Sequence, residues 1–392
     1  MKLLFIADGR SPTASGWIGY FPAAGYEVHL VSTYPAEPLP GLASFTEIPG
    51  ILAAASAASG GGSGGWIRRM TAPGLRTAVR RRLEGRTITR RARRLREVIR
   101  QVEPDLVHAL RIPFEGMLAA KALSPAPVMA MRSIPLVLSV WGNDFTLHAA
   151  AGKRMGERTR TALRQASAVI ADCARDIRLA HQWGFPAGMP TTVLPGGGGV
   201  RAEIFFTGDP PPEQPIRIVQ PRGLRAYVEN EAFLHAVPAV LARYPETRFS
   251  CPGLKAGGNL AALVDQLGIG RAVDLLPPVS QPELAALFRN SAIVLSPTTH
   301  DGTPNSLLEA LACGCFPIAG DLESIREWIA PGENGLLVNA GDPESIARGI
   351  LDAIGAPALR AEARKRNLRL ISERALYRNV MPQAADFYSS LT

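Results

Sequence analysis

The sequence predicts an α/β protein with two doubly wound domains, each a parallel sheet covered by helices on both faces. Three observations carry this prediction. The chain has 392 residues, more than one compact core usually holds. Short apolar runs alternate with segments of helical periodicity along almost the whole sequence. A proline-rich connector at 208–215 divides these elements into two sets, and such alternation is typical of parallel sheets.

The first set of elements begins at the N-terminus. Its opening residues hold only five apolar side chains before Asp8, which predicts a buried first strand and not a signal peptide. The longest apolar stretch, 127–141, is interrupted by Arg132, so we expect no membrane-spanning helix. Helices are predicted at Gly116–Leu123 and Met155–Gln165. The predicted strands are Leu3–Ala7, Val28–Val31, Leu106–His108, Leu136–Val140, Ala168–Ala171 and Thr192–Leu194.

The second set follows the connector. The predicted strands are Ile216–Val219, Arg248–Cys251, Val273–Leu276, Ile293–Ser296, Phe316–Ala319 and Gly335–Val338. The predicted helices are Glu231–Arg243, Glu283–Arg289, Asn305–Cys313 and Pro343–Ile354. We therefore expect an N-terminal domain over 1–207 and a C-terminal domain over 208–370, with helices in 371–392 packing back onto the first domain. A ligand is expected between the domains, at the carboxyl ends of the strands.

Cysteine usage favours a reducing compartment and argues against a metal centre. The four cysteines are spread along the chain within predicted strands or helices: Cys173, Cys251, Cys313 and Cys315. The Cys313-Gly314-Cys315 pair has apolar flanks and no second pair nearby, so we interpret it as a buried structural feature. We expect a cytoplasmic protein without a bound metal.

The positive charge of the chain is concentrated in residues 66–100. This segment holds thirteen arginines and two acidic residues, Glu84 and Glu97. The net charge of the segment therefore exceeds the net charge of +9 of the whole chain. A broken apolar stripe runs through it: Ile67, Val79, Leu83, Leu95, Val98 and Ile99. Such helices adsorb to anionic headgroups, so we expect contact with an anionic membrane surface or a lipid-linked acceptor. A solvated helical face is the alternative. Nucleic acid is disfavoured because aromatic side chains are scarce there.

The richest cluster of functional residues lies at 296–314. An apolar strand ends at Ser296, a polar loop follows, and a helix is predicted from Pro304 or Asn305, with Thr303 as its N-cap. The N–H groups at such a helix start form an anion site that suits a diphosphate. The two carboxylates on either side of this start, Asp301 and Glu309, can accept hydrogen bonds from sugar hydroxyls. Without further information, capping and solvated roles for these residues remain open.

The same segment resembles the donor-site signature of the retaining "family 4" glycosyltransferases of the GT-B fold, the glycosyl transferases group 1. That signature reads Glu-Gly-x-Pro-x-x-Leu-Leu-Glu-Ala-x-Ala-Cys-Gly and continues with a strand, a turn and Glu-x-Ile. This chain matches it through 316–327 and again through 332–338, about 50 contiguous residues in all. The resemblance implies a GT-B architecture, with two Rossmann-like domains facing across a cleft.

The resemblance also implies roles for the residues at this segment. Glu309 is expected to bind the nucleotide ribose. Asp301, which stands where the family usually has Glu, is expected to contact the hydroxyls of the donor sugar near the reacting carbon. The backbone that is expected to hold the sugar and phosphates comprises Gly302, Thr303, Pro304, Asn305, Ser306 and Leu307.

Further candidate residues follow other strands. The family places an Arg and, about six residues later, a Lys on the diphosphate. Here Arg222 matches the first, Val228 replaces the second, and Arg225 is expected to substitute with its planar guanidinium. In the first domain, Trp141-Gly142-Asn143-Asp144 resembles the family's His-Gly-x-Asp segment, which makes Asp144 a candidate catalytic residue beside Asp301.

The loop after the first strand is expected on the acceptor side, with Gly9 and Arg10 as its candidate residues. The resemblance implies a metal-independent retaining hexosyltransferase that needs no cofactor. Its substrate would be a nucleotide sugar, UDP- or GDP-linked, and its acceptor a glycan or lipid-linked molecule in cell-surface polysaccharide or glycolipid synthesis at the inner membrane face. A catalytically lapsed nucleotide-sugar-binding protein and a GT-B-fold sugar epimerase remain as alternatives.

Overall fold

The computed structural model describes residues 1–50, 73–124, 134–211, 215–255 and 258–392, with the side chains of the long helix described from residue 88 onward. The part of the predicted basic segment at 66–72, with Ile67, lies outside the described residues, as do the side chains of Val79 and Leu83. Residues 127–133 of the predicted apolar stretch also lie outside them. The chain forms two compact units. Unit 1 comprises Met1–Gly198 and Val380–Thr392, and unit 2 comprises Gly199–Asn379. Each unit is described by itself.

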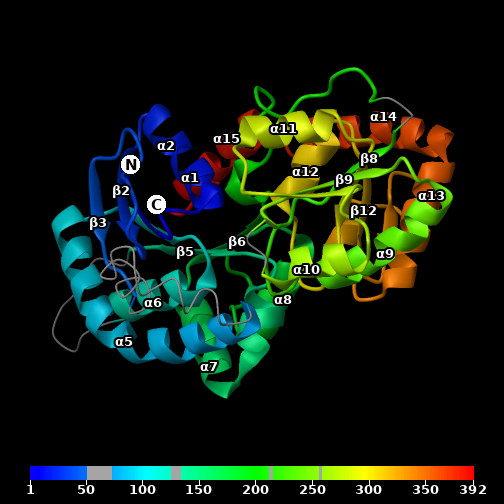
Figure 1. Ribbon diagram of the computed structural model, residues 1–392. Coiled ribbons are helices and arrows are strands. Elements are labelled where there is room, and N and C mark those ends of the chain that lie inside the picture. Colours follow the sequence, from blue (N-terminus) through cyan, green and yellow to red (C-terminus); the bar gives the residue numbers. More distant parts are fainter. Residues whose placement is uncertain (51–72, 125–133, 212–214, 256–257) are drawn as a thin grey trace. The chain divides into compact units, whose positions relative to one another are not determined.

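Unit 1 is built on a seven-stranded sheet, counted over the described residues, in the order β3-β2-β1-β4-β5-β6-β7 with every pair parallel. Its strands are β1 (Lys2–Ala7), β2 (Glu27–Ser32), β3 (Ser44–Glu47), β4 (Leu106–Ala109), β5 (Leu136–Val140), β6 (Ala168–Ala171) and β7 (Thr191–Val193). The strand order reverses between β1 and β4, and ligands bind in such sheets at the carboxyl ends of the two strands at this switch point. Figure 1 shows β2 and β3 on one side of this point and β5 and β6 on the other.

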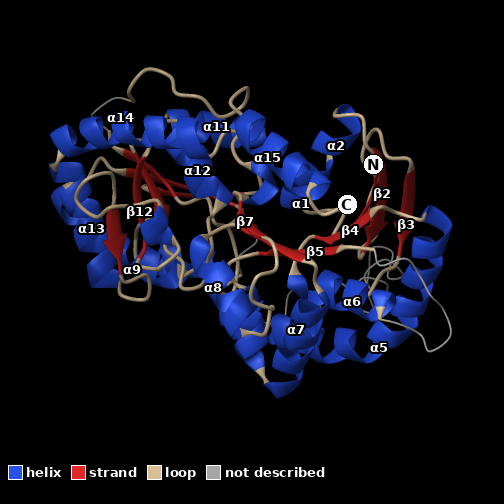
Figure 2. Ribbon diagram, turned by 180° about the vertical axis from the view of Figure 1, so that it is seen from behind, coloured by secondary structure: helices blue, strands red, loops and turns tan. Residues whose placement is uncertain are grey.

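Helices cover this sheet on both faces (Figure 2). They are α1 (Pro12–Ile18), α2 (Tyr20–Ala23), α5 (Pro73–Val102), α6 (Met117–Leu123), α7 (Lys153–Gln165), α8 (Ala174–Gln182) and α15 (Tyr377–Ser389). Because α15 is the last helix of the chain, the terminal residues complete the first unit. Tyr388 on α15 is fully buried and stacks on Phe21, with ring centroids 5.0 Å apart.

Two local features of unit 1 were not predicted. Residues 8–13 were expected to form a loop, but α1 already begins at Pro12 because Ser11 caps it by accepting a hydrogen bond from the Ala14 N–H. The edge strand β3 holds one large apolar side chain, Phe45, and all four of its residues are only half-buried, so its sequence lacks the apolar run of the other strands.

The basic segment forms part of one long helix, α5. The described residues of its apolar stripe are not exposed for contact with a membrane surface. Leu95 and Ile99 are buried in the core of unit 1, and Val98 packs against that core. The prediction that these three side chains form an adsorbing stripe is therefore wrong, because the sheet and α6 need an apolar cover there. Arginines on the opposite face are exposed, among them Arg93 and Arg94. In the described residues, no helix is both long and apolar enough to cross a membrane.

Unit 2 repeats the same topology with a six-stranded parallel sheet, again counted over the described residues, in the order β10-β9-β8-β11-β12-β13. The strands are β8 (Arg217–Val219), β9 (Arg248–Pro252), β10 (Val273–Leu276), β11 (Ile293–Ser296), β12 (Phe316–Gly320) and β13 (Leu336–Val338). The helices are α9 (Asn230–Arg243), α10 (Asn259–Gln266), α11 (Gln281–Arg289), α12 (Asn305–Ala312), α13 (Pro343–Gly355) and α14 (Pro357–Arg374). Its switch point lies between β8 and β11.

The apolar strands of both units lie in their cores, as periodicity predicts. Ile218 of β8 and Leu295 of β11 are at most 1% exposed and belong to one core cluster of unit 2. Cys313 and Cys315 are buried in a second cluster. Burial raises the pKa of the Cys315 thiol well above its ordinary value, so this side chain behaves as an apolar core residue. All four cysteines are free and buried.

Candidate functional site

The topology of unit 2 brings two segments together that the sequence separates by about eighty residues. Arg222 follows β8, and Asp301 follows β11, the two strands on either side of the switch point. An antiparallel bridge between Val228 and Thr298 ties the two loops to each other. Residues at the carboxyl ends of such neighbouring parallel strands face one crevice, so the guanidinium and the carboxylate meet there.

Arg222 is the centre of this arrangement. Its side chain is 6% exposed, and its two terminal nitrogens donate to Ser306 Oγ at 3.0 Å and to Asp301 Oδ2 at 2.5 Å. Its Nε–H is buried and has no hydrogen-bond partner within the described part of the chain. Burying a donor without an acceptor costs about 1–3 kcal/mol, so this nitrogen is a ready contact for an incoming anion.

A second layer of polar side chains holds Arg222 in place. The Arg222 N–H donates to Gln220 Oε1 at 2.7 Å, and the Gln220 amide in turn donates to Asn230 Oδ1. Asn230 then donates to the Gly223 carbonyl at 3.2 Å. Gly223 has a φ of 61°, a left-handed conformation that favours glycine, and it lies against the backbone of Gly253. The turn after β8 is thus fixed before any ligand arrives.

The loop 301–304 is fastened from the opposite side by the segment that contains the Glu-x-Ile element. Ser324 Oγ donates to the Asp301 carbonyl at 2.8 Å, and Trp328 Nε1 donates to Thr303 Oγ1 at 2.9 Å. The prediction that Thr303 caps the helix is wrong, because its oxygen is turned to the Trp328 indole. Pro304 occupies the cap position instead, and α12 begins at Asn305.

Glu309 lies one turn inside α12, on the side of Arg222. Burial raises its pKa from 4.5 to about 7, and the charge of Arg222 opposes this shift. A carboxyl group with such a pKa titrates near neutrality, and its ionised form accepts hydrogen bonds. The expected contact of Glu309 with a nucleotide ribose stays a prediction. Of the neighbouring residues, Leu307 is fully buried, while Ser306 is partly exposed.

Arg225 and Val228, the two other positions considered for the diphosphate, have different surroundings from Arg222. Arg225 is exposed, and the described residues give its guanidinium no hydrogen bond or ion pair. Val228, at the position where the family has Lys, is 7% exposed and points into the protein. Gly302 is buried in the loop beside Asp301. The substitution of the missing lysine by Arg225 stays a prediction.

In unit 1, Asp144 is a buried carboxylate with no exposed surface on its side chain. Its Oδ1 accepts from Arg111 at 2.7 Å, and its Oδ2 accepts from the N–H groups of Ile112 at 3.1 Å and Trp141 at 3.3 Å. Burial raises the pKa of this carboxyl group, and the Arg111 charge opposes the rise. The geometry makes Asp144 a link between the loops after β4 and β5, and its expected catalytic role stays a prediction.

The loop after β1 contains the predicted acceptor-side residues. Arg10 donates to both oxygens of Asp8, at 3.0 and 2.9 Å, and its guanidinium lies 3.6 Å from the centroid of the Tyr34 ring. The Gly9 N–H donates to Ser32 Oγ, and a Cβ at this position would lie 2.8 Å from that oxygen. Glycine is therefore required here, and the charge of Arg10 is compensated locally.

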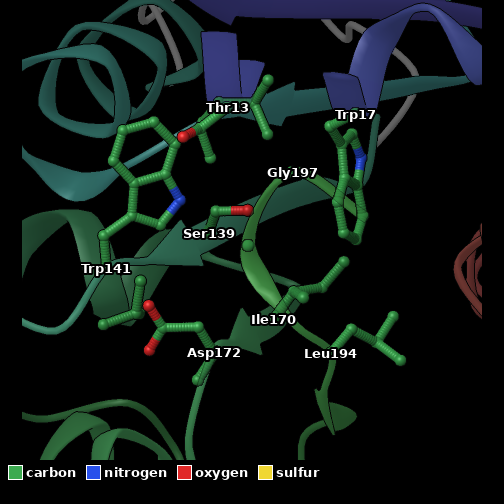
Figure 3. Close-up of a pocket in the computed structure, with 12 residues that line it drawn as sticks. Thr13, Trp17, Ser139, Trp141, Ile170, Asp172, Leu194 and Gly197 are labelled. Carbon is green, nitrogen blue, oxygen red and sulfur yellow. The ribbon is translucent and has the colours of Figure 1, made fainter. Parts of the chain in front are cut away.

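A pocket opens at the carboxyl ends of β4, β5 and β6, beneath α1 (Figure 3). Trp17 and Trp141 stand on opposite sides of it, Ser139 points between them, and Asp172 lies at its lower edge (Figure 3). Its volume is about 10 Å³, which is room for a single water-sized group. No Lys, Arg or His belongs to the described residues that line it.

Next to this pocket, the ligand atoms of Asp172, Cys173 and Asp176 lie within 4.8 Å of one another. Arg175 donates to Asp176 Oδ1 at 2.9 Å and to the Gly142 carbonyl at 2.8 Å, which places a fixed positive charge in the group. Burial raises the pKa of the Cys173 thiol, whose neutral form is a poor metal ligand. The geometry favours an ion-paired cluster over a metal site.

Comparison with known families places this geometry in context. A family model described as "Glycosyl transferase 4-like domain" matches residues 9–197, and one described as "Glycosyl transferases group 1" matches residues 224–355. The two matches cover both sheets except β1 and β8. The chain belongs to the group 1 glycosyl transferases.

Among curated members of this family, the D-inositol 3-phosphate glycosyltransferase of Thermobispora bispora is 30% identical over 137 residues, 32% of this chain and 32% of that protein. The match thus spans about a third of the relative's length. Among solved structures, sucrose-phosphate synthase from Thermosynechococcus elongatus has a TM-score of 0.74 at 14% identity, covering 100% of this chain and 99% of that one. Anabaena HepE in complex with UDP has a TM-score of 0.70 at 16% identity, with 100% of each chain covered.

Several residues of this candidate site were missed from the sequence. Gln220 and Asn230 are polar residues next to a strand end and a helix start, and only their spacing around Arg222 hints at a shared network. Arg111 pairs with Asp144 across the sheet and has a φ of 126°, a conformation rare for residues other than glycine. Its contribution could have been suspected from a lone Arg directly after a buried strand.

Proposed function

We propose that this chain transfers a sugar from a nucleoside diphosphate sugar to an acceptor hydroxyl. The observation that carries the proposal is Arg222. It is a buried guanidinium at the switch point, with an unpartnered Nε–H, beside the start of α12 and between Asp301 and Ser306. A diphosphate offers the oxygens that this donor lacks, and a planar guanidinium binds two of them at once. Family membership and the UDP in the HepE structure support the assignment.

The same arrangement suits the chemistry of the leaving group. As the bond between the anomeric carbon and the diphosphate breaks, negative charge grows on the phosphate oxygens. Arg222 and the first N–H groups of α12 stabilise that charge from fixed positions. Arg222 then exchanges its bond with Asp301 for bonds to phosphate, which releases the Asp301 carboxylate for a hydroxyl of the transferred sugar. Glu309, once ionised, accepts from the ribose hydroxyls.

The finer features of the reaction rest on the family resemblance. They are retention of configuration, independence from metal ions and a phosphate oxygen that takes the acceptor's proton. In that scheme the acceptor hydroxyl attacks from the face that the diphosphate leaves, so no protein base is required. Asp144 contributes through the loop that holds Trp141, and the donor is a UDP- or GDP-linked hexose. No cofactor enters this scheme.

Nucleotide binding tests the proposal most directly. Isothermal titration of UDP, GDP, ADP and dTDP into the full chain is expected to show micromolar affinity for one of them. That affinity should be lost in Glu309→Ala and kept in Glu362→Ala, a control carboxylate on the surface of α14 that pairs with Lys365. Failure of all four nucleotides to bind would contradict the donor-site assignment.

Turnover separates the enzyme from its alternatives. With the donor that carries the selected nucleotide, the chain is expected to release nucleoside diphosphate at equal rates with and without EDTA. NMR of the product should show the anomeric configuration of the donor. Binding without turnover would favour the lapsed catalyst, and release of an altered free sugar nucleotide would favour the epimerase.

For the acceptor, we propose a glycan or lipid-linked molecule in polysaccharide or glycolipid synthesis, reached at an anionic membrane surface from the cytoplasmic side. The exposed arginines of α5 support this proposal, since each basic residue near such a surface contributes about 1 kcal/mol. Those described are Arg90, Arg93, Arg94 and Arg100. The chain should sediment with vesicles that contain anionic lipid and not with neutral ones, and equal binding to both would refute the idea.

A further inference from the structure

A chain of buried hydrogen bonds runs from the last helix of unit 1 to the pocket beneath α1. Trp17 Nε1 donates to the Tyr388 hydroxyl at 2.8 Å. The same hydroxyl bonds to His108 Nδ1, and His108 Nε2 lies 2.9 Å from Ser139 Oγ. His108 and Tyr388 are fully buried, and Ser139 is 4% exposed. Residues of four elements, α1, β4, β5 and α15, thus form one line of hydrogen bonds that ends at the pocket wall.

The directions of these bonds follow from what each group can donate. An indole N–H only donates, so the Tyr388 oxygen accepts from Trp17. Within the described residues His108 is the other partner of Tyr388, so the phenolic proton is donated to His108 Nδ1. Burial lowers the pKa of His108 to about 3, so the ring is neutral and carries one proton. That proton lies on Nε2 and is donated to Ser139 Oγ.

Ser139 is consequently left with its own hydroxyl proton to donate. Its one hydrogen bond among the described residues is the one that it accepts from His108. Ser139 lines the pocket, and its side chain points into it between the two indoles (Figure 3). The line of hydrogen bonds therefore makes Ser139 a donor toward the pocket.

The opposite wall of the pocket carries the complementary group. Asp172 follows β6, next to β5, and lines the lower edge of the same pocket (Figure 3). An ionised carboxylate only accepts hydrogen bonds. A ligand group in the cavity must therefore accept a hydrogen bond from Ser139 and donate a hydrogen bond to Asp172. A hydroxyl does both, a phosphate or carboxylate oxygen cannot donate, and an ammonium group cannot accept.

We propose that this pocket is a socket for one hydroxyl group of a neutral sugar, with Ser139 as donor, Asp172 as acceptor, and Tyr388 and His108 as positioning residues. The cavity of about 10 Å³ fits a single hydroxyl, while Trp17 and Trp141 offer apolar walls for the adjoining C–H groups. The proposal deepens the proposed function, on which it rests, by naming the chemistry that unit 1 recognises. The hydroxyl belongs either to the transferred sugar or to the acceptor.

The tautomer of His108 tests the proposal without any ligand. Long-range ¹H–¹⁵N NMR of the full chain labelled with ¹⁵N-histidine is expected to show the Nε2–H tautomer between about pH 6 and 8. Tyr388→Phe, which removes the donor to Nδ1, should mix the two tautomers, whereas the neighbouring surface variant Ser389→Ala should not. An Nδ1–H tautomer in the wild type would overturn the proposal, because Ser139 would then donate to His108 and offer only lone pairs to the pocket.

Binding of free sugars tests the socket itself. In saturation-transfer NMR with the full chain, we expect at least one of D-glucose, D-galactose, D-mannose and glycerol to bind. Ser139→Ala should weaken that ligand about 5-fold, the effect of one neutral hydrogen bond, and Ser389→Ala should not change its affinity. Binding of none of the four, or equal affinity in Ser139→Ala, would overturn the proposal.

Titration with UDP and UDP-glucose identifies the source of the hydroxyl. If it belongs to the transferred sugar, Ser139→Ala weakens UDP-glucose and leaves UDP unchanged. If it belongs to the acceptor, Ser139→Ala weakens only the free sugar. Should no nucleotide bind at all, the proposed function fails, while the His108 tautomer and the free-sugar affinities still decide on the socket.

Discussion

Each unit contains an Arg–Asp pair that joins two loops at the carboxyl edge of its sheet, and the two pairs differ in how much of their bonding capacity is used. In unit 1, Asp144 is completely enclosed and both of its oxygens are occupied, one by Arg111 and one by two backbone N–H groups. In unit 2, Asp301 keeps 14% of its side-chain surface exposed, and Arg222 retains a buried Nε–H without a partner among the described residues.

The difference teaches that residue type does not decide the role of an ion pair. A pair whose donors and acceptors are all satisfied holds loops together and has nothing left to offer a ligand. A pair with an unsatisfied donor can open and re-form around an anion at little cost. We therefore expect substitutions in the first pair to change stability and substitutions in the second to change binding.

The largest effect is expected for Asp144→Ala. Removing this carboxylate leaves the N–H groups of Ile112 and Trp141 without this acceptor and takes the ionic partner from Arg111. Arg111 keeps its hydrogen bond to Asn143 Oδ1. The free energy of unfolding of unit 1 should fall by about 3 kcal/mol. Urea denaturation followed by circular dichroism measures it. Asp8→Ala, which breaks the exposed pair with Arg10, is the control and should cost less than about 1 kcal/mol. Equal losses in both variants would show that Asp144 is not a structural link.

Next is Arg222→Ala, which should weaken nucleotide binding about 100-fold in calorimetric titration, because charge-assisted bonds to the diphosphate are lost. Arg222→Lys keeps the charge without the planar fork, so an intermediate loss of about 10-fold is expected. Arg326→Ala, at an exposed pair with Asp321, is the matched control and should bind nucleotide normally. If the control loses as much affinity as Arg222→Ala, the assignment of the diphosphate to Arg222 is wrong.

Glu309→Gln should separate stability from binding. The folded pKa of about 7 exceeds the ordinary 4.5, so the stability that protonation contributes is fully present below about pH 4.5 and is lost as the pH rises through about 7. Glutamine stays neutral, so the variant should be about 2 kcal/mol more stable than the wild type at pH 8 and similar to it near pH 4.5. Thermal unfolding at both pH values measures this. A variant that is less stable at pH 8 would contradict the pKa shift.

The smallest effect is expected for Thr303→Val. The Trp328 indole loses its acceptor, which should cost about 1 kcal/mol of stability in unit 2 and loosen the loop that presents Asp301. Differential scanning calorimetry compares it with Thr161→Val, where the exposed hydroxyl bonds only to the Glu157 carbonyl one turn earlier. A Thr303 variant as stable as the control would mean that the indole bond contributes nothing.

Much of the fold could be predicted because its strands are continuous apolar runs. The bounds of β5, β6, β10 and β11 agree with those expected from the sequence, and the expectation of two Rossmann-like domains is confirmed. The edge strand β3 escaped prediction, since one Phe among polar residues gives no alternation to recognise. The apolar stripe of the basic helix was misjudged because periodicity shows that one face is buried without showing what buries it.

Within the candidate site, the segment 301–309 could be predicted from the sequence because its residues are contiguous. Arg222 required the family pattern, and its partners Gln220 and Asn230 carried no signal of their own. Hydrogen bonds between segments, such as Trp328 to Thr303 or Tyr388 to His108, depend on which side chains the fold brings together. No spacing along the chain encodes them, so the helix cap at Thr303 was assigned by local rules that a distant indole overrides.

The return of α15 to the first unit has a consequence for how the protein is made. Ribosomes deliver residues 1–198 first, yet Tyr388, which fills the core of that unit and bonds to Trp17, is synthesised 371 positions after its partner. All residues of unit 2 are synthesised before the last residues of unit 1. The aromatic core of unit 1 therefore lacks Tyr388 during the time in which unit 2 can already fold. The order of translation is therefore the reverse of the order in which the two cores can close.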